Sequence, residues 1–192
     1  TGTTATMTLL ETKIRAVGIV SPGDMGHAVG RELRRHGLDV LTCLNGRSER
    51  TKALSHSAGI RSVDSLRHLV TESDVILSIL VPAKAETSAE EIAEAIREAK
   101  AAVHVVDCNA ISPAVACRIA ARITRENALF SDAGIIGFPP GTTSVPKLYV
   151  SGPNSQSLCA LDGMGITVKR LGPEIGQASG MKMCYAALTK GT

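Results

Sequence analysis

The 192-residue sequence has no tryptophan, and aromatic residues make up only 2% of it. Stacking of nucleic-acid bases and anchoring in a lipid interface both rely on aromatic side chains. The composition therefore argues against a nucleic-acid platform and against an aromatic-anchored membrane protein. Because 44% of the residues are nevertheless hydrophobic, the core must be built from aliphatic side chains.

Long apolar runs and a strong charge imbalance are also missing. The longest apolar stretch, Val75–Val81, has the length of a strand, whereas a membrane-spanning helix needs about 20 residues. Residues Thr1–Thr6 contain no basic residue and no apolar stretch, so we expect no signal peptide. The net charge of +3 is too small for a polyanion-binding surface but allows a local anion pocket. We expect neither a membrane nor a nucleic acid as partner.

Cysteine and histidine patterns typical of disulfide or metal frameworks are absent. The five cysteines are unevenly spaced and form no C-x-x-C pair, and the five histidines have no metal-ligand spacing. An odd number of scattered cysteines is typical of reduced thiols in the cytosol. The sequence therefore predicts a cytoplasmic protein without a metal.

What is present is an alternation of apolar β-rich runs and helical patterns from residue 14 to about residue 125. This alternation is typical of βαβ units, and it predicts an α/β fold of Rossmann type with a doubly wound, mostly parallel sheet. Strands are predicted at Ile14–Val20, Leu38–Leu44, Val75–Val81 and Val103–Asp107. Further short strands are predicted at 129–133, 147–151 and 166–168, with a Gly/Pro-rich loop at 134–146 and a last helix at 176–188.

Capping signals place several helix starts. Ser48 is predicted to open a charged helix, and Ser112 before Pro113 is typical of an N-cap followed by proline at the first helical position. Ser88 and Glu91 have the spacing of a capping box, which predicts a helix start at Ser88. The last helix has an apolar face that nothing later in the sequence covers, formed by Ala178, Met181, Tyr185 and Leu188.

The first predicted strand runs into a glycine-containing loop. A dinucleotide site places G-x-G-x-x-G there, because the chain must turn tightly, approach the pyrophosphate with bare backbone and present a helix N-terminus. Gly23 and Gly26 supply the second and third glycines, and Ser21 stands at the first position. We predict a pyrophosphate site, with a plain strand-to-helix turn as the alternative. Its predicted cofactor contacts are Gly18, Ser21, Pro22, Gly23, Asp24, Met25 and Gly26.

The end of the second strand predicts the type of cofactor. An NAD site usually has an acidic residue here to bind the ribose hydroxyls, but this sequence has the neutral Asn45. Arg47, Ser48 and Arg50 follow, and such cationic and hydroxyl groups suit a 2′-phosphate. The sequence therefore favours NADP over NAD, and the alternative is a solvated helix start.

Several segments in this order resemble one known family: GIVSPGDMG (18–26), NGRS (45–48), DCNAISP (107–113), DAGIIG (132–137) and GQASGMK (176–182). Together they are similar to the β-hydroxyacid dehydrogenase family, which includes 3-hydroxyisobutyrate and 6-phosphogluconate dehydrogenases and, more distantly, imine reductases. The resemblance covers nearly the whole chain. The later segments are most similar to a poorly characterised, 6-phosphogluconate-dehydrogenase-like branch.

The resemblance implies that Lys182 is the general acid/base acting on the substrate hydroxyl or carbonyl. A lysine beside an apolar face can have its pKa lowered toward the working pH by desolvation. Without the resemblance, Lys182 would be interpreted as a side chain that extends from a buried helix to solvent. Tyr185, one turn later, stands where most of the family has asparagine, and its phenol is a second candidate catalytic group.

The resemblance also places residues beside the nicotinamide and the substrate. Asn109 and Ala110 stand where the family usually has Ser-Thr, and Asn109 is predicted to bind cofactor or substrate, with an ordinary turn residue as the alternative. Val81 and Pro82 complete the predicted cofactor contacts. Where the family commonly reads D-A-P-V-S-G-G, this sequence has Ile136 in place of the serine and Phe138 in place of the last glycine. These changes favour a more apolar or bulkier substrate than a small hydroxy-carboxylate.

These observations predict an NADP-dependent oxidoreductase that transfers a hydride between nicotinamide and a carbonyl or alcohol carbon of a small molecule. The alternatives are an imine reductase-like enzyme and a nucleotide-binding module without catalysis. We expect a flexible segment at 1–12, a Rossmann domain at 13–174 and the start of an interdomain helix at 175–192. Because the family adds an all-helical domain after that helix, we expect a longer, homodimeric enzyme.

Overall fold

The computed structural model describes residues 13–141 and 145–190, so the segment expected at 1–12 lies outside the described residues. The elements are β1 (Ala16–Val20), α2 (Asp24–Arg35), β2 (Asp39–Cys43), α3 (Glu49–Ser57), β3 (Arg61–Val63), α4 (Leu66–Glu72), β4 (Val75–Ser78), η1 (Pro82–Lys84), α5 (Ala85–Ala99), β5 (His104–Asp107), α6 (Pro113–Thr124), β6 (Leu129–Ile136), β7 (Lys147–Ser151), η2 (Ser155–Leu161), β8 (Thr167–Gly172) and α7 (Gln177–Lys190). The elements η1 and η2 are 3₁₀-helices.

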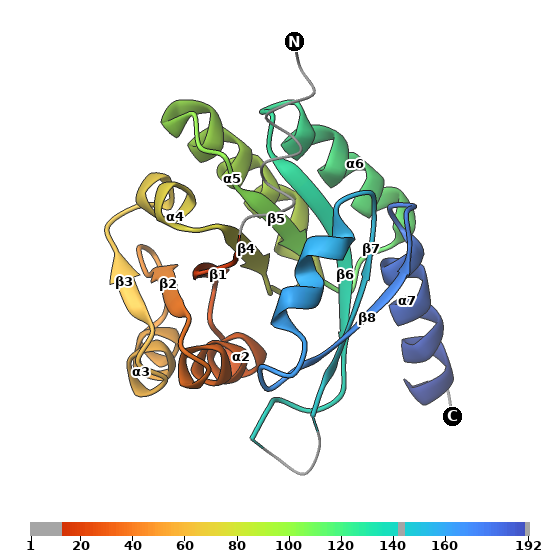
Figure 1. The fold of residues 1–192 in the computed structure, drawn as a ribbon, viewed down its shortest axis with the longest axis horizontal. Coiled ribbons are helices and arrows are strands. Elements are labelled where there is room, and N and C mark those ends of the chain that lie inside the picture. Colours follow the sequence, from red (N-terminus) through yellow and green to blue (C-terminus); the bar gives the residue numbers. More distant parts are fainter. Residues whose placement is uncertain (1–12, 142–144, 191–192) are drawn as a thin grey trace.

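All these strands form one sheet in the order β3-β2-β1-β4-β5-β6-β7-β8 (Figure 1). The first six strands are parallel, β7 is antiparallel to β6, and β8 is parallel to β7. The chain moves outward from β1 to β3 and then returns to β4 on the other side of β1. The order therefore reverses between β1 and β4, which is where ligands bind at the carboxyl edge of such sheets. The predicted doubly wound α/β fold is confirmed.

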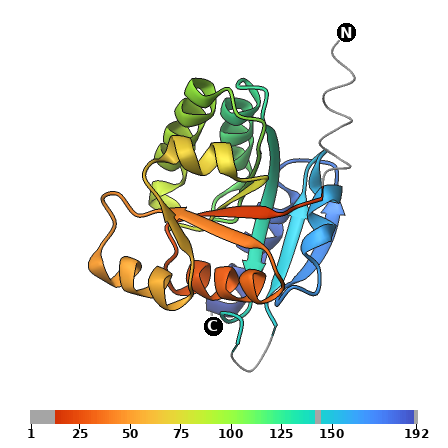
Figure 2. The same ribbon diagram turned by 60° about the vertical axis from the view of Figure 1, so that its left-hand side comes forward.

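Helices cover both faces of the sheet. Figure 2 shows α2 and α3 on one side of the strands and α4, α5 and α6 on the other. Each side has its own aliphatic core, because alternate residues of a strand point to opposite faces. In β1, Val17 and Ile19 pack toward α2, whereas Val20 belongs to the core under α4 and α5. This layered core holds the loops at the carboxyl edge in fixed positions.

Gly18 shows why one residue of β1 must lack a side chain. A Cβ atom at Gly18 would lie 2.5 Å from Ile76 Cδ1, 2.7 Å from Ser73 Oγ and 3.1 Å from Leu69 Cδ1. The glycine therefore lets α4 and its flanking residues approach the sheet closely. Gly18 lies inside the strand, three residues before the turn at Ser21, so this packing accounts for the glycine without the cofactor contact that the sequence predicted for it.

Two of the predicted helix starts are confirmed, and one is wrong. Ser48 and Ser112 are N-caps whose side chains accept hydrogen bonds from the first turns of α3 and α6. The predicted start at Ser88 is wrong, because α5 begins at Ala85 and Ser88 is buried inside it. The 3₁₀ turn that opens with Pro82 already sets helical geometry before α5, so the Ser88 side chain comes too late to cap the helix.

Several strand boundaries differ from the sequence expectation. The strand predicted to end at residue 133 continues to Ile136, because Gly134–Ile136 pair with the antiparallel β7. The strand predicted at 75–81 ends at Ser78, and the one predicted at 166–168 runs on to Gly172. The elements β3 and α4 were not predicted. The expectation that the apolar face of the last helix lacks a covering surface is wrong for Ala178, which is fully buried, whereas Tyr185 and Leu188 are exposed.

Candidate active site

The loop after β1 makes a tight turn at Ser21. This residue has φ of +60°, in the left-handed region, and its carbonyl accepts a 2.7 Å hydrogen bond from Gly23 N. Glycine adopts this conformation without steric strain, which explains the glycine usual at this position of a dinucleotide loop. Ser21 thus adopts the turn conformation that a glycine has in the usual motif, although the sequence match is imperfect. The chain enters the N-terminus of α2 directly after this turn.

Gly23 and Gly26 have different surroundings. A Cβ at Gly26 would lie 3.3 Å from Ile19 Cγ2 and 3.4 Å from the Ser21 carbonyl, so Gly26 allows α2 to pack closely on β1. A Cβ at Gly23 would meet only the Ser21 carbonyl, at 4.0 Å. Gly23 is the N-cap of α2. Because it has no side chain, the amides of the first turn receive no side-chain hydrogen bond from the cap. Bare backbone and amides of a helix N-terminus fit an anionic pyrophosphate.

Asn45 is held at the end of β2 by a neighbouring loop. The residues Leu44–Arg47 form a turn, with Gly46 at φ of +68° and Arg47 N bonded to the Leu44 carbonyl at 3.1 Å. The Asn45 amide donates a 2.6 Å hydrogen bond to the Asp64 carbonyl after β3. Asn45 therefore joins two strand ends and places no negative charge beside them.

The residues of the predicted cationic cluster, Arg47, Ser48 and Arg50, have different bonding partners in the structure. Arg50 forms an ion pair with Asp24 at 2.5 Å, across the mouth of the glycine loop. The Ser48 hydroxyl accepts a hydrogen bond from Thr51 N as the cap of α3. Arg47 differs, because its Nε is buried without a hydrogen-bond acceptor in the part of the chain that the structure describes. The Arg47 guanidinium is therefore the group in this cluster most in need of an anion.

Asn109 joins the carboxyl ends of β4 and β5. Its Oδ1 accepts a 2.6 Å hydrogen bond from Leu80 N, and its Nδ2 donates to Ser78 Oγ at 3.1 Å and to Asp107 Oδ2 at 3.0 Å. The residue is buried, so these bonds satisfy its amide within the protein. Both N–H groups of the Asn109 amide are engaged, and its Oδ1 accepts one hydrogen bond and has a second lone pair. Val81 and Pro82, which follow this network, are exposed at the same edge.

Lys182 lies over the end of β5. Its Nζ donates a 2.9 Å hydrogen bond to the carbonyl of Cys108, the residue directly after the strand. The helix that carries it, α7, packs on β6 and β7 beside α6 (Figure 1). The structure thus brings Lys182 to Cys108, next to Asn109 in the chain. Tyr185 lies one turn later and is exposed.

The buried carboxyl group of Asp107 lies close enough to Lys182 for their charges to interact. Burial raises the pKa of Asp107 from 3.8 to about 6, hydrogen bonds from Asn109 act in the opposite direction, and the Lys182 charge also lowers it. The charge of Asp132, opposite Asp107 in the sheet, raises it. Burial also raises the pKa of the Cys108 thiol, which argues against a thiolate nucleophile here. Asp107 and Lys182 are thus two titratable groups at this edge whose charges interact, and Asp107 is the more deeply buried of them.

Asp132 was quoted in the family resemblance, but its role was missed. It is fully buried, and its Oδ2 accepts hydrogen bonds from Gly176 N at 3.0 Å and Ser179 N at 2.9 Å. Ser151 Oγ and Ser179 Oγ also donate to its carboxylate. Asp132 therefore caps α7 from a neighbouring strand. An acidic residue just before a loop gives no sequence signal for a cap more than 40 positions later.

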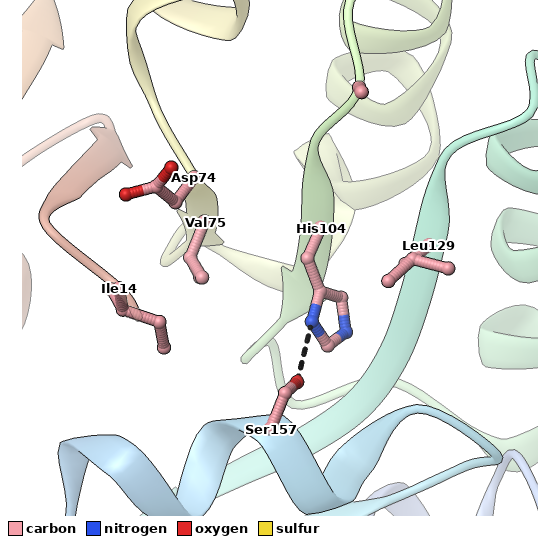
Figure 3. A pocket seen from close by; sticks show the side chains of 7 residues that line it. Ile14, Asp74, Val75, His104, Leu129 and Ser157 are labelled. Atoms are coloured by element: carbon pink, nitrogen blue, oxygen red, sulfur yellow. Dashed lines mark hydrogen bonds between the residues drawn. The ribbon is translucent and has the colours of Figure 1, made fainter. Parts of the chain in front are cut away.

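A cavity of about 40 Å³ lies at the opposite, amino edge of the sheet. Figure 3 shows His104 reaching toward Ser157, which lies on η2, with Asp74 and Leu129 also around the cavity. His104 Nδ1 is 3.2 Å from Ser157 Oγ, and Nε2 is 2.9 Å from Ser131 Oγ. Because its ring nitrogens are both engaged, we interpret His104 as a buried structural residue, remote from the glycine loop.

We expect His104 to make stability depend on pH. Burial lowers its pKa from 6.5 to about 4, so the unfolded chain binds the proton first as the pH falls. The stability that neutral His104 provides is complete above pH 6.5 and declines between pH 6.5 and 4, by about 3 kcal/mol. Urea unfolding at pH 7, 5 and 4 should show this loss in the wild type relative to His104→Gln.

The comparison with the variant is needed because Asp107 acts in the opposite direction. Its raised pKa means that the folded chain gains stability from protonation between about pH 6 and 4. That contribution is common to both proteins and cancels in the difference. An unfolding free-energy difference that stays constant with pH would show that His104 titrates normally.

Neither a membrane-spanning helix nor a metal-binding cluster is present in the part of the chain that the structure describes. Within residues 13–141 and 145–190, no helix combines the length and apolarity needed to cross a bilayer. The same residues contain no group of three or more His, Cys, Asp or Glu side chains placed to hold a metal ion.

The reversal of strand order and the glycine loop beside it are the features of a dinucleotide-binding domain. The family model for the NAD binding domain of 6-phosphogluconate dehydrogenase matches residues 16–162. The chain belongs to this family, and the resemblance to the β-hydroxyacid dehydrogenases is confirmed.

Individual relatives agree with this assignment. An uncharacterised 28.5 kDa protein of Methanothermus fervidus is 28% identical over 174 residues, which are 91% of this chain and 65% of that protein. The solved structure of a conserved protein of unknown function, described as similar to 3-hydroxyacid dehydrogenases, is 27% identical with a TM-score of 0.80. The matched region is 92% of this chain and 65% of that chain. The chain thus spans slightly less than two thirds of the length of these relatives.

More distant structures share the fold. The 3-hydroxyisobutyrate dehydrogenase of Mycobacterium tuberculosis, solved with L-serine, has a TM-score of 0.77 at 19% identity. The matched region is 91% of this chain and 60% of that chain. An imine reductase variant of Myxococcus stipitatus, solved with NAD⁺, has a TM-score of 0.74 at 21% identity. The matched region is 94% of this chain and 62% of that chain. At these identities the likeness concerns the arrangement of the elements.

Proposed function

We propose that the protein is an NADP-dependent oxidoreductase that interconverts a carbonyl and an alcohol on a small molecule, with Lys182 as general acid/base. The observation that carries this proposal is the position of Lys182 Nζ, 2.9 Å from the Cys108 carbonyl at the end of β5. That strand end lies at the same sheet edge as the glycine loop, because β1, β4 and β5 are parallel neighbours. The proposed proton donor and the proposed nucleotide-binding loop thus lie at the same edge of the sheet.

The residues present fit a dinucleotide. The open space at Gly23 and the uncapped N-terminus of α2 leave backbone N–H groups for the pyrophosphate. The buried Nε of Arg47 suits a phosphate on the ribose, because a charged acceptor would satisfy it. Asn45 contributes no carboxylate that would repel this phosphate. When bound, the nicotinamide supplies or accepts the hydride.

In this proposal the proton is transferred by a side chain of the protein, that of Lys182. In the reductive direction the Lys182 ammonium donates a proton to the substrate oxygen as the carbonyl carbon gains the hydride, and in oxidation the neutral amine takes that proton back. The Cys108 carbonyl holds Nζ at the strand end and keeps the side chain extended. Asn109 positions the Leu80 backbone through its 2.6 Å bond and so shapes the floor of the site.

An imine reductase-like activity is the second candidate. Ile136 ends β6 where the family commonly has serine, and the nearby Phe138 is exposed, so this side of the site offers apolar contacts. An imine needs the same proton from Lys182, delivered to nitrogen instead of oxygen. A screen of the complete gene product with hydroxy acids, aldehydes and cyclic imines distinguishes the two activities. Nucleotide binding without turnover of any of them would instead support a non-catalytic module.

Replacing Arg47 by alanine should weaken NADPH binding about tenfold or more and leave NADH binding nearly unchanged. A charge-assisted hydrogen bond contributes about 1.5–3 kcal/mol, and only NADPH carries the 2′-phosphate that Arg47 would bind. The measurement is a fluorescence titration of both cofactors with the wild type and the variant. Arg125→Ala is a matched control, because Arg125 is an exposed arginine at the C-terminus of α6. Equal wild-type affinities for the two cofactors would contradict the NADP proposal.

The remaining expectations about the whole protein stay proposals. We propose that the complete enzyme acts on a small molecule as a homodimer, with α7 leading into the rest of the length that its relatives have. A reducing, cytoplasmic compartment fits the five cysteines, none of which is paired with another. Size-exclusion chromatography with light scattering on the complete gene product tests the dimer.

A further inference from the structure

The first turn of α7 is attached to the sheet through two neighbouring strands. Asp132 of β6 accepts hydrogen bonds from Gly176 N and Ser179 N, and Ser151 of β7 donates to Asp132 while accepting from Ala178 N at 3.0 Å. All the side chains in this network are fully buried. These bonds satisfy amides that an α-helix leaves unpaired at its start, and the carboxylate also faces the positive end of the helix.

Gly134 makes the second contact between β6 and α7. It follows Asp132 by two residues and therefore points to the same face of the sheet. A Cβ at Gly134 would lie 3.1 Å from Lys182 Cβ, 3.2 Å from Lys182 Cδ and 3.3 Å from the Ala178 carbonyl. The aliphatic part of Lys182 thus passes over Gly134 on its way to the Cys108 carbonyl.

The two contacts fix α7 at two points, because Asp132 holds Ser179 and Gly134 lies against Lys182, one turn further along the helix. We propose that Asp132 and Gly134 are positioning residues that set the register of α7 on β6 and thereby the location of Lys182 Nζ. Neither residue touches the reacting atoms. The placement itself stands on the geometry, and its effect on turnover rests on the function proposed for Lys182.

The placement can be measured without turnover by NMR of the chain carrying ¹³C-labelled lysine, with the Lys182 signal assigned from Lys182→Arg. Asp132→Ala removes the cap, and Gly134→Ala places a methyl group against the lysine. We expect both to shift the Lys182 side-chain signal, and Asp132→Ala to accelerate exchange of the Ser179 amide at least about tenfold. Ser131→Ala is the matched control, because Ser131 lies on the same strand but bonds His104 on the opposite face.

The kinetic readout separates positioning from general destabilisation. In the complete gene product we expect Asp132→Ala and Gly134→Ala to lower kcat about tenfold to a hundredfold, with little change in KM for the nucleotide. The control should change neither. If Asp132→Ala does not fold, Ser179→Ala takes its place, because it removes only the hydroxyl that donates to Asp132.

The outcomes are distinguishable. An unchanged Lys182 signal in both Gly134→Ala and the cap variant would overturn the inference, whatever the activity. A shifted signal with unchanged kcat would support the positioning roles and contradict the catalytic role of Lys182. A shifted signal with reduced kcat supports both.

Discussion

Lys182→Ala should reduce turnover by about 10² to 10⁴-fold, the range typical of losing a general acid/base. The substrate oxygen would then have to exchange its proton with water, because the Asp107 carboxylate and the Cys108 thiol are buried. Nucleotide affinity should stay at the wild-type value, since the pyrophosphate contacts proposed at Gly23 lie on another element. Steady-state kinetics and nucleotide titration of the complete gene product measure both quantities.

Two further variants sharpen this test. Lys182→Arg keeps the positive charge but holds its proton at any working pH, so it should be nearly as inactive as the alanine variant. Tyr185→Phe removes the other candidate proton donor, and its exposed position predicts a much smaller effect. Wild-type rates in Lys182→Ala would show that the chemistry lies elsewhere. A large loss in Tyr185→Phe alone would transfer the role to the phenol.

Gly23→Val should abolish nucleotide binding while the fold remains intact. The protein has space at this position, because a Cβ would meet only the Ser21 carbonyl at 4.0 Å. The restriction must then come from the ligand, whose pyrophosphate approaches bare backbone at the second glycine of the motif. Isothermal titration calorimetry with NADPH measures the binding, and thermal unfolding followed by circular dichroism measures the fold.

Gly18→Val is the matched comparison and should show the opposite pattern. Its side chain would collide with Ile76 and Ser73 inside the core, which costs about 1–3 kcal/mol of stability. The glycine loop would be untouched, so any folded fraction should still bind nucleotide. If Gly23→Val keeps wild-type affinity, the loop is not the pyrophosphate site and the plain-turn interpretation holds.

Local patterns in the sequence were sufficient for much of the fold. The buried strands are recognisable because both of their faces are covered, which gives continuous aliphatic runs such as Val75–Leu77. The caps at Ser48 and Ser112 are local as well, since each side chain bonds an amide three residues later. The glycine loop could be located because it must follow a strand and precede a helix.

Features that depend on distant partners were not predictable. The β6 strand is longer than expected because β7 returns beside it, and no pattern within Gly134–Ile136 reveals that pairing. Nothing in the sequence indicated that the Asn109 amide bonds residues at the end of β4, about 30 positions away, and its contact with a ligand stays a prediction. The anchoring of α7 by Asp132 likewise joins residues that only the folded sheet brings together.

The two outer strands of the sheet have a consequence for self-association. An open sheet exposes unpaired backbone groups at its edges, and these are templates for strand-to-strand aggregation. At one edge β3 has only three residues and includes Arg61, and at the other β8 carries Lys169 and Arg170. A short strand offers few bonds to an approaching chain, and two copies of β8 would bring like charges together. Fibrous growth through either edge is therefore disfavoured.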